Sequence, residues 1–157
     1  MLFGADRDIA VTPTVQNSSY SSGNAIGALS TVSVLRGDAV YGGIINNFWI
    51  ASKSGQTPTI TVYIFSANPT GSTVTDKSAF SLASADLSKL IVAPFALTLA
   101  APTGTTASFA QLSNIGAEFA NQDSPTTTNI YVALVSGSTF TPGSTSDIVF
   151  KVNVTQD

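Results

Sequence analysis

The stretch that decides the fold runs from residue 59 to residue 91 and reads TITVYIFSANPTGSTVTDKSAFSLASADLSKLI. Its first part alternates strictly, with Ile60, Val62 and Ile64 on one face and threonine and aromatic side chains on the other. Such alternation of β-branched and aromatic residues is typical of a strand that turns one face to the core of a sandwich. Residues 59–67 are therefore predicted to form a β-strand.

The rest of this stretch contains a turn followed by a helical pattern. In the turn NPTGS, Pro69 fixes φ, and Gly71 is expected to take a positive φ. From residue 84 onward, SADLSKLI places Leu87, Leu90 and Ile91 on one helical face. We expect one short helix, residues 84–91, on a connection between strands, where it closes one end of the sandwich and buries this face.

The ends of the expected helix carry suitable polar residues. Ser84 is predicted to cap the N-terminus. Asp86 and Lys89 lie near the ends of the helix dipole that favour their charges. Ser88 and Lys89 are adjacent, and because neighbouring helical residues do not face each other, they are not expected to act as a catalytic pair.

The flanking sequence repeats short strand patterns between turns rich in glycine, proline, serine and threonine. Further strands are expected at residues 25–36, 42–52, 95–101, 107–115, 129–137 and 147–157, with a turn at 37–42 and a loop at 120–128. In residues 42–52, simple alternation puts Ile44, Asn46, Phe48 and Ile50 on one face and Ile45, Asn47, Trp49 and Ala51 on the other. The pattern predicts an all-β fold, a β-sandwich or jelly roll of about eight antiparallel strands.

The N-terminal segment, residues 1–24, is predicted to be an extended arm or an edge strand. Ile9, Val11 and Val15 alternate, and Pro13 is a residue that sheets accept at edges and strand starts. Such an arm either pairs outside its own domain or closes its own sheet. Residues 25–157 are expected to form a single β-sandwich domain.

The composition favours a protein that works inside an assembly. Of the 157 residues only 10% are charged, against roughly 25% in an average soluble protein, while 21 serines and 20 threonines supply the polar surface. A surface with so little like-charge repulsion tolerates close packing against other subunits. A monomer that is simply rich in serine and threonine is the alternative.

The charge pattern argues against two classes of partner. The net charge is −3, and the six basic residues are scattered. Because no basic stripe is present, binding to nucleic acid or to anionic membranes is not expected. No run of about 20 mainly apolar residues predicts a membrane span.

The residue types present restrict the chemistry. With no histidine and no cysteine, Ser-His-Asp and Cys-His catalysis and the usual zinc sites are excluded. Five acidic residues lie in turn or cap contexts, where aspartate is usually structural: Asp38, Asp76, Asp86, Asp123 and Asp147. A hydrolase built on two carboxylates, or a calcium site at Asp6 and Asp8, remains an alternative. We expect no enzyme activity, no catalytic or metal-binding residues and no cofactor.

Aromatic and apolar residues divide into two groups. Those on alternating strand positions are expected to pack in the core rather than to form a sugar platform: Trp49, Phe65, Tyr131, Phe140 and Phe150. Those in the arm and loops are candidates for contacts with other subunits or with a capsid: Leu2, Phe3, Ile9, Val11, Val15, Tyr20 and Tyr41.

Three segments resemble a known family. These are residues 20–37, residues 42–91 and residues 139–157, and the run from Phe65 to Ile91 is the most specific. Together they resemble small structural proteins of tailed bacteriophages, which include head-decoration, or cement, proteins. The resemblance implies a non-enzymatic protein of the capsid exterior, made in the cytoplasm of a bacterial host, with the major capsid protein and other copies of itself, as a dimer or trimer, as partners.

One alternative from a different class is kept open. It is a tail or baseplate structural protein that binds host-surface carbohydrate. An exposed aromatic groove with converging aspartate or asparagine side chains would favour this alternative.

Overall fold

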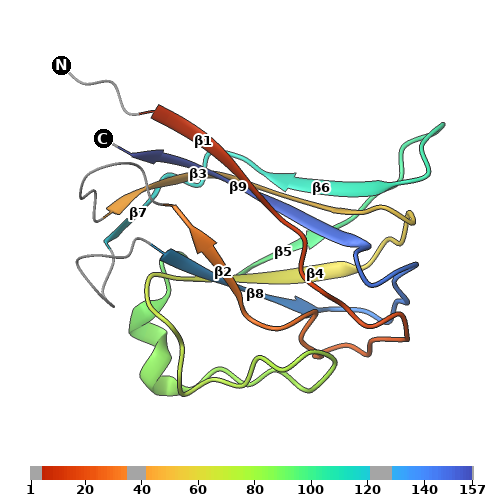
Figure 1. Ribbon diagram of the computed structural model, residues 1–157, viewed down its shortest axis with the longest axis horizontal. Coiled ribbons are helices and arrows are strands. Elements are labelled where there is room, and N and C mark those ends of the chain that lie inside the picture. The colour runs from red at the N-terminus through yellow and green to blue at the C-terminus, as the bar shows by residue number, and fades with distance from the viewer. Residues whose placement is uncertain (1–4, 35–41, 121–128, 157) are drawn as a thin grey trace.

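The computed structural model describes residues 5–34, 42–120 and 129–156 (Figure 1). The described residues form nine strands and one short 3₁₀ helix: β1 (Ala5–Val11), β2 (Ser30–Ser33), β3 (Gly42–Ser52), β4 (Thr59–Phe65), η1 (Ser84–Lys89), β5 (Phe95–Thr98), β6 (Ser108–Leu112), β7 (Ala117–Ala120), β8 (Asn129–Ser136) and β9 (Ile148–Gln156). The turn and loop expected at 37–42 and 120–128 lie largely outside the described residues, as do Asp38 and Asp123.

The strands form two antiparallel sheets that pack face to face. One sheet has the order β1-β9-β3-β6, with β7 also paired to β3, and the other has the order β2-β8-β4-β5. In β3, β7 pairs with the first residues and β6 with the last ones, so the two strands follow one another along the same edge. The all-β sandwich is thereby confirmed, although β7 was not expected from the sequence.

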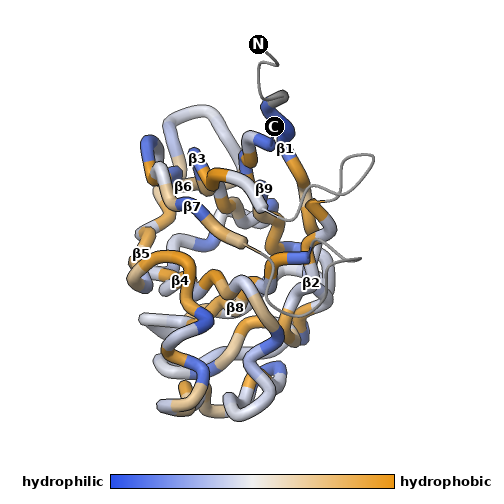
Figure 2. Tube along the Cα trace, turned by 90° about the vertical axis from the view of Figure 1, so that its left-hand side faces the viewer, coloured by the Kyte–Doolittle hydropathy of each residue, from blue (hydrophilic) through white to orange (hydrophobic). Residues whose placement is uncertain are grey.

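The core lies between the two sheets, where alternation predicted it. Ile60, Val62 and Ile64 of β4 are fully buried, and so are the alternating residues of β9 from Ile148 to Val154. The rings of Phe48 and Phe150 stack in this layer with centroids 5.4 Å apart. Figure 2 shows the hydrophobic stretches concentrated on the strands of both sheets.

Simple alternation fails in β3 because the strand contains a β-bulge. The pairing register with β9 shifts between Ile45 and Asn47, which inserts Asn46 as an extra residue. Ile45, Phe48 and Ile50 therefore face the core together. The expectation that Ile44 and Asn46 share a face with Phe48 and Ile50 is wrong: one inserted residue reverses the direction of every side chain before it.

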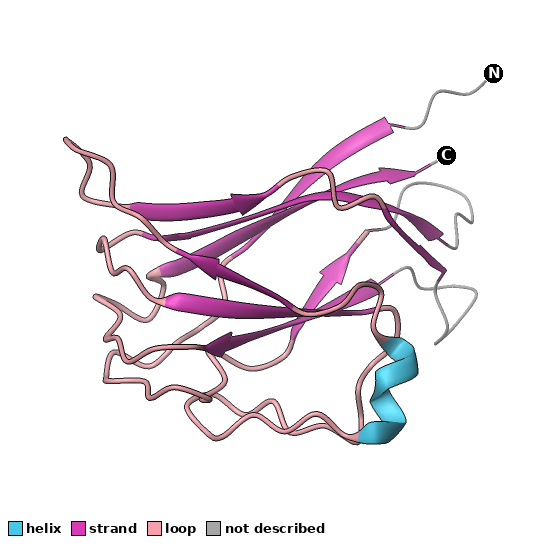
Figure 3. Cartoon of the chain, turned by 180° about the vertical axis from the view of Figure 1, so that it is seen from behind, coloured by secondary structure: helices cyan, strands magenta, loops and turns pink. Residues whose placement is uncertain are grey.

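A third layer covers the outer face of the four-stranded sheet. The connection between β4 and β5 runs beneath this sheet and carries η1 (Figures 1 and 3). It forms backbone hydrogen bonds with the segment after Tyr20, such as Phe80 N–H to Gly23 O at 2.9 Å. The Phe80 ring packs on Tyr63 with centroids 4.5 Å apart. Phe65 and Ala133, which face outward from their strands, are consequently fully buried.

The helix is confirmed in place, but its details differ from expectation. It is a 3₁₀ helix whose N-cap is Ala83, and no side chain caps it, so the predicted Ser84 cap is wrong. Leu87 is 53% exposed rather than buried, because 3₁₀ geometry and the short length leave it on the outside. Leu90 has already left the helix and bridges to Phe65 in an extended conformation.

Asp86 holds the helix to the preceding turn. It is buried, it pairs with Lys89 Nζ at 2.8 Å, and it accepts a hydrogen bond from Ser72 Oγ at 2.7 Å. These bonds lower the pKa of Asp86 below its usual value. Gly71 does not take the expected positive φ. It permits close approach instead, since a Cβ there would lie 3.1 Å from Ala83 Cβ, tighter than an ordinary contact.

Two further aspartates join loops, as their turn contexts predicted. Asp76 accepts hydrogen bonds from the Tyr20 hydroxyl at 2.5 Å and from Gly27 N–H at 2.7 Å. Burial, reinforced by the bond to Asp76, raises the pKa of Tyr20 well above its usual value. Asp147 is buried and accepts from the backbone and side chain of Ser54 at 2.7 and 2.8 Å.

Candidate functional site

The outer face of the five-stranded sheet differs from that of its partner sheet. No described segment crosses it (Figures 1 and 3), and most of its side chains are exposed or half-buried. We call this surface the open face and define it by the outward residues of β1, β9, β3 and β6. In the described structure, many side chains on this face are both held in place by strands and accessible to solvent.

Trp49 lies at the centre of the open face. Strand pairing places it beside Lys151 of β9 on one side and Gln111 of β6 on the other. Lys151 Nζ lies 4.7 Å from the centre of the indole ring, and no ion pair is present for this ammonium among the described residues. Phe109, which is 42% exposed, stacks beside the indole with ring centroids 6.5 Å apart.

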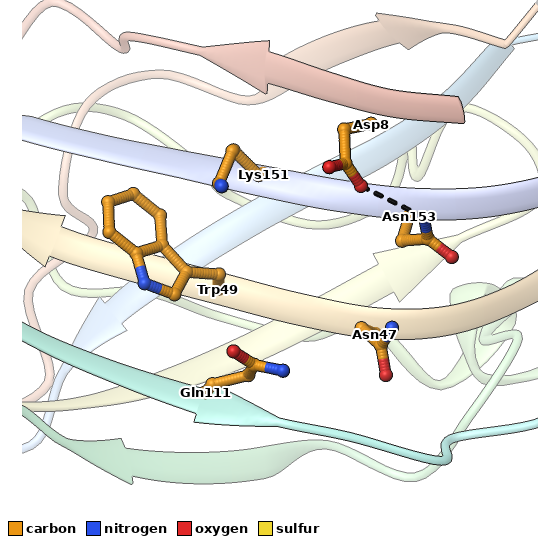
Figure 4. A pocket seen from close by; sticks show the side chains of 6 residues that line it. All are labelled: Asp8, Asn47, Trp49, Gln111, Lys151 and Asn153. Carbon is orange, nitrogen blue, oxygen red and sulfur yellow. Dashed lines mark hydrogen bonds between the residues drawn. The ribbon is translucent and has the colours of Figure 1, made fainter. Parts of the chain in front are cut away.

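Amide and carboxylate groups lie next to this aromatic pair. Asn47 of β3 pairs in register with Asn153 of β9, which pairs in turn with Asp8 of β1. Asn153 Nδ2 donates a hydrogen bond to Asp8 Oδ1 at 2.9 Å. A hollow of about 130 Å³ lies between these groups and Trp49 (Figure 4), lined by Asp8, Asn47, Trp49, Gln111, Lys151 and Asn153.

A second, more open hollow adjoins the first along the same strands. It shares Asn47 and Asn153 and is lined in addition by Asp6, Asn46, Asn114, Gly116 and Thr155. Asn46 Nδ2 donates to Thr155 Oγ1 at 2.6 Å and to Asn153 Oδ1 at 3.2 Å. The bulge in β3 is the reason that Asn46 and Asn47 both reach the open face.

Several polar atoms of the first hollow are available to a ligand. In the described part of the chain, Asn47 Nδ2, Asp8 Oδ2 and Gln111 Oε1 have no hydrogen-bonding partner. The hollow therefore offers both a hydrogen-bond donor and hydrogen-bond acceptors around the indole ring of Trp49. It contains one acidic and one basic side chain, so its formal charge is balanced.

The open face shows no arrangement typical of catalysis or metal binding. Each of its two hollows is lined by a single carboxylate, whereas hydrolysis of a glycoside by the usual mechanism needs two that flank the bond. The described residues contain no group of three or more histidine, cysteine, aspartate or glutamate side chains that would hold a metal ion. None of the described helices has the length and apolar character that crossing a membrane requires.

The expected contact residues do not gather at this site. Leu2, Phe3 and Tyr41 lie outside the described residues. Ile9 and Val11 are half-buried and pack from β1 against the core.

Val15 and Tyr20 are buried, and Tyr20 stacks on Phe140 with ring centroids 5.3 Å apart. Both side chains are thus enclosed within this chain, and their contact with another subunit stays a prediction. Both pack in the hydrophobic core cluster, and the Tyr20 hydroxyl also bonds to Asp76 of the third layer.

Sequence reasoning missed the central residue of the open face. Trp49 was expected in the core, as Phe65, Phe140 and Phe150 are, but it faces outward and is only half-buried. The signal that was available is the pair Asn46-Asn47 inside an otherwise apolar strand. Under strict alternation one of these two amides would face the core, and a bulge is what lets both face outward.

Comparison with known proteins gives little guidance. No protein-family model and no curated protein matches the chain. Among solved structures, the chain is similar to a chain from the native virion of Kashmir bee virus at neutral pH, with 9% sequence identity, 99% of this chain and 70% of that chain covered, and a TM-score of 0.36. For the native virion of Kashmir bee virus at acidic pH, the identity is 8%, the coverages are again 99% and 70%, and the TM-score is 0.29. At these TM-scores the similarity carries no argument about function.

Proposed function

We propose that the chain is a non-enzymatic virion structural protein that binds the outer surface of a tailed-phage capsid and stabilises the shell. The observation that carries this proposal is the edge of β1 with which no described strand pairs, called the free edge below. This strand pairs with β9 from Ala5 to Val11 and ends the sheet order, so no described strand pairs with its other side. The resemblance of the chain's sequence to head-decoration proteins, strongest in residues 65–91, supports the same function.

A free edge strand is a ready template for a strand from another chain. Its outward backbone N–H and C=O groups form hydrogen bonds with an added strand. Asp6, Arg7 and Asp8 are exposed on β1, and charges at an edge discourage unselective pairing. The partners are then the major capsid protein and, in a dimer or trimer, another copy of this chain.

Binding to the assembled shell stabilises it by mass action. A ligand that binds only the folded or assembled state contributes RT ln(1 + [L]/Kd) for each site, which is about 2.7 kcal/mol when the free protein is at about 100 times its Kd. Many sites on one shell together resist internal genome pressure. This function requires a rigid body and a binding edge, and neither a cofactor nor a catalytic group.

The test is cosedimentation of the purified protein with capsids stripped of accessory proteins. We expect saturation at a fixed ratio of copies to capsid subunits and a higher melting temperature of the shell. A Trp49→Ala variant, altered on the open face and not on the β1 edge, is expected to bind equally well. Absence of binding to stripped shells would contradict the proposal.

A second candidate function is favoured by a specific observation. In a tail or baseplate protein that binds host-surface carbohydrate, we expect an exposed aromatic side chain among convergent aspartate and asparagine groups. The open face has this arrangement at Trp49, Asp8, Asn47 and Asn153. Immunogold labelling of intact virions distinguishes the two locations, because a head-decoration protein labels the capsid and a baseplate protein labels the tail tip.

A further inference from the structure

We infer that the open face is a binding site for an uncharged oligosaccharide, with one sugar ring against Trp49 and a second ring in the adjoining hollow. This inference rests on the carbohydrate binding of the second candidate function, not on its tail location, and specifies the ligand. It concerns the chemistry of the face itself, and it holds whether the protein lies on the head or on the tail.

The aromatic pair supplies the surface for the first ring. One face of a pyranose ring presents C–H bonds with a partial positive charge, and the face of an indole ring is negative, so the two attract when water is excluded. Trp49 is half-buried on a strand and is flanked by the Phe109 ring. This support fixes the orientation of the indole before a ligand arrives, which lowers the entropic cost of binding.

The polar groups around Trp49 match the hydroxyls of a sugar. Each hydroxyl both donates and accepts a hydrogen bond, and the hollow offers Asn47 Nδ2 as a donor and Asp8 Oδ2 and Gln111 Oε1 as acceptors. These atoms belong to side chains on strands of one sheet, and the sheet holds them at fixed spacings. A ligand with several hydroxyls on a rigid ring uses such an arrangement better than a flexible peptide does.

The charges select against acidic ligands. The first hollow contains one carboxylate, Asp8, and one ammonium, Lys151, and the second adds the carboxylate of Asp6. Together with the chain's net charge of −3, this disfavours nucleic acid and polyuronic chains, although bases also stack on tryptophan. Lys151 lies beside the indole without an ion pair in the described structure, so it is free to turn aside when a sugar ring enters.

The two hollows define a minimum ligand length. They share Asn47 and Asn153, so a ligand that fills both must continue from one hollow into the next along the strands. A monosaccharide reaches only one of them. A disaccharide or longer chain contacts Trp49 with one ring and the Asp6, Asn46 and Thr155 network with the next.

The chain contains a single tryptophan, which makes the site its own reporter. The experiment first screens the wild-type protein on an array of neutral and acidic oligosaccharides. It then titrates the protein with neutral mono-, di- and trisaccharides from the array, with tryptophan fluorescence as the readout. We expect neutral di- and trisaccharides to shift the emission of Trp49 and to bind more tightly than monosaccharides.

Variants separate this site from adventitious binding. In calorimetric titration with the best trisaccharide, Trp49→Ala is expected to weaken binding about tenfold or more, as truncation of an aromatic anchor does. Asp6→Ala is expected to weaken binding of the trisaccharide and leave that of the monosaccharide unchanged. The matched control is Leu87→Ala, which removes an exposed apolar side chain from η1 and should bind like the wild type.

The outcomes that overturn the inference are specific. They are the absence of any neutral saccharide bound on the array, binding of acidic saccharides alone, or saccharide binding that Trp49→Ala leaves intact in a variant whose melting temperature shows it to be folded. If saccharides bind as expected but immunogold labels only capsids, the tail location fails and the saccharide site stands. If stripped shells bind no protein while saccharides do, the shell-binding function fails alone.

Discussion

Replacing Asp147 by alanine tests whether this buried aspartate joins the loops at one end of the sandwich. Its side chain is 1% exposed and lies just before β9. Oδ2 accepts hydrogen bonds from Ser52 Oγ at 3.0 Å, Ser54 Oγ at 2.8 Å and Gly143 N–H at 3.2 Å, and Oδ1 accepts from Ser54 N–H at 2.7 Å. One carboxylate thus connects the turn after β3 to the turn before β9.

The expected loss follows from these four bonds. A hydrogen bond to a charged group contributes about 1.5–3 kcal/mol, and a buried partner left without a bond costs about 1–3 kcal/mol. Ser52 is fully buried, whereas Ser54 and Gly143 are exposed and regain water when the carboxylate is removed. We therefore expect Asp147→Ala to lower the free energy of unfolding by about 2–4 kcal/mol, a large part of the roughly 5–15 kcal/mol of a typical domain.

Equilibrium denaturation in urea measures this loss. Asp147→Asn keeps one acceptor oxygen and loses the charge, so we expect it to cost about half as much, roughly 1–2 kcal/mol. Asp8→Ala is the matched control: Asp8 is exposed and accepts a bond from Asn153, so its removal should change the free energy of unfolding by no more than about 0.5 kcal/mol. An Asp147→Ala variant as stable as the control would refute the reasoning.

Three further predictions concern the third layer. The hydrogen bonds from Lys89 and Ser72 lower the pKa of Asp86, so the carboxylate stabilises the fold above its usual pKa of 3.8, and this contribution is lost as the pH falls through the lower folded pKa. Asp86→Asn should thus flatten the acid limb of a plot of melting temperature against pH, and an unchanged limb would contradict the assignment. Leu90→Asp should lower the melting temperature and Leu87→Asp should not, because Leu90 is half-buried and bridges to Phe65 whereas Leu87 is exposed; equal losses would disprove this difference in burial. Tyr20→Phe should cost about 1–2 kcal/mol in urea denaturation, since it removes the hydroxyl bonded to Asp76, and in the wild type the ultraviolet signal of phenol ionisation from Tyr20 should emerge only when the protein unfolds in alkali.

The strands that follow a clean alternation were predictable from sequence. In β4, and in β9 from Ile148 to Val154, each inward position carries an apolar side chain, so period two is visible without knowledge of the partner strands. Four-residue β7 was not predictable, because AEFA alone has too few residues to show a period. Its pairing depends on the first part of β3, which is distant in sequence.

The open face was not predictable from alternation because two non-local effects create it. The β3 bulge depends on pairing with β9 and brings Asn46 to the same face as Asn47 and Trp49. The third layer buries Phe65 and Ala133 on the other sheet, and no such layer covers the open face in the described structure. In the sequence, Trp49 and Phe65 both lie at alternating positions of a strand. Only the tertiary arrangement buries Phe65 and leaves Trp49 accessible.

Hydrogen exchange of the protein bound to stripped capsids, compared with the free protein, tests the central claim most directly. If the shell binds at the free edge of β1, the amides of residues 5–11 gain protection on binding, while those around Trp49 on β3 do not. Protection confined to other strands, or no added protection on shells that carry bound protein, would contradict shell binding through this edge.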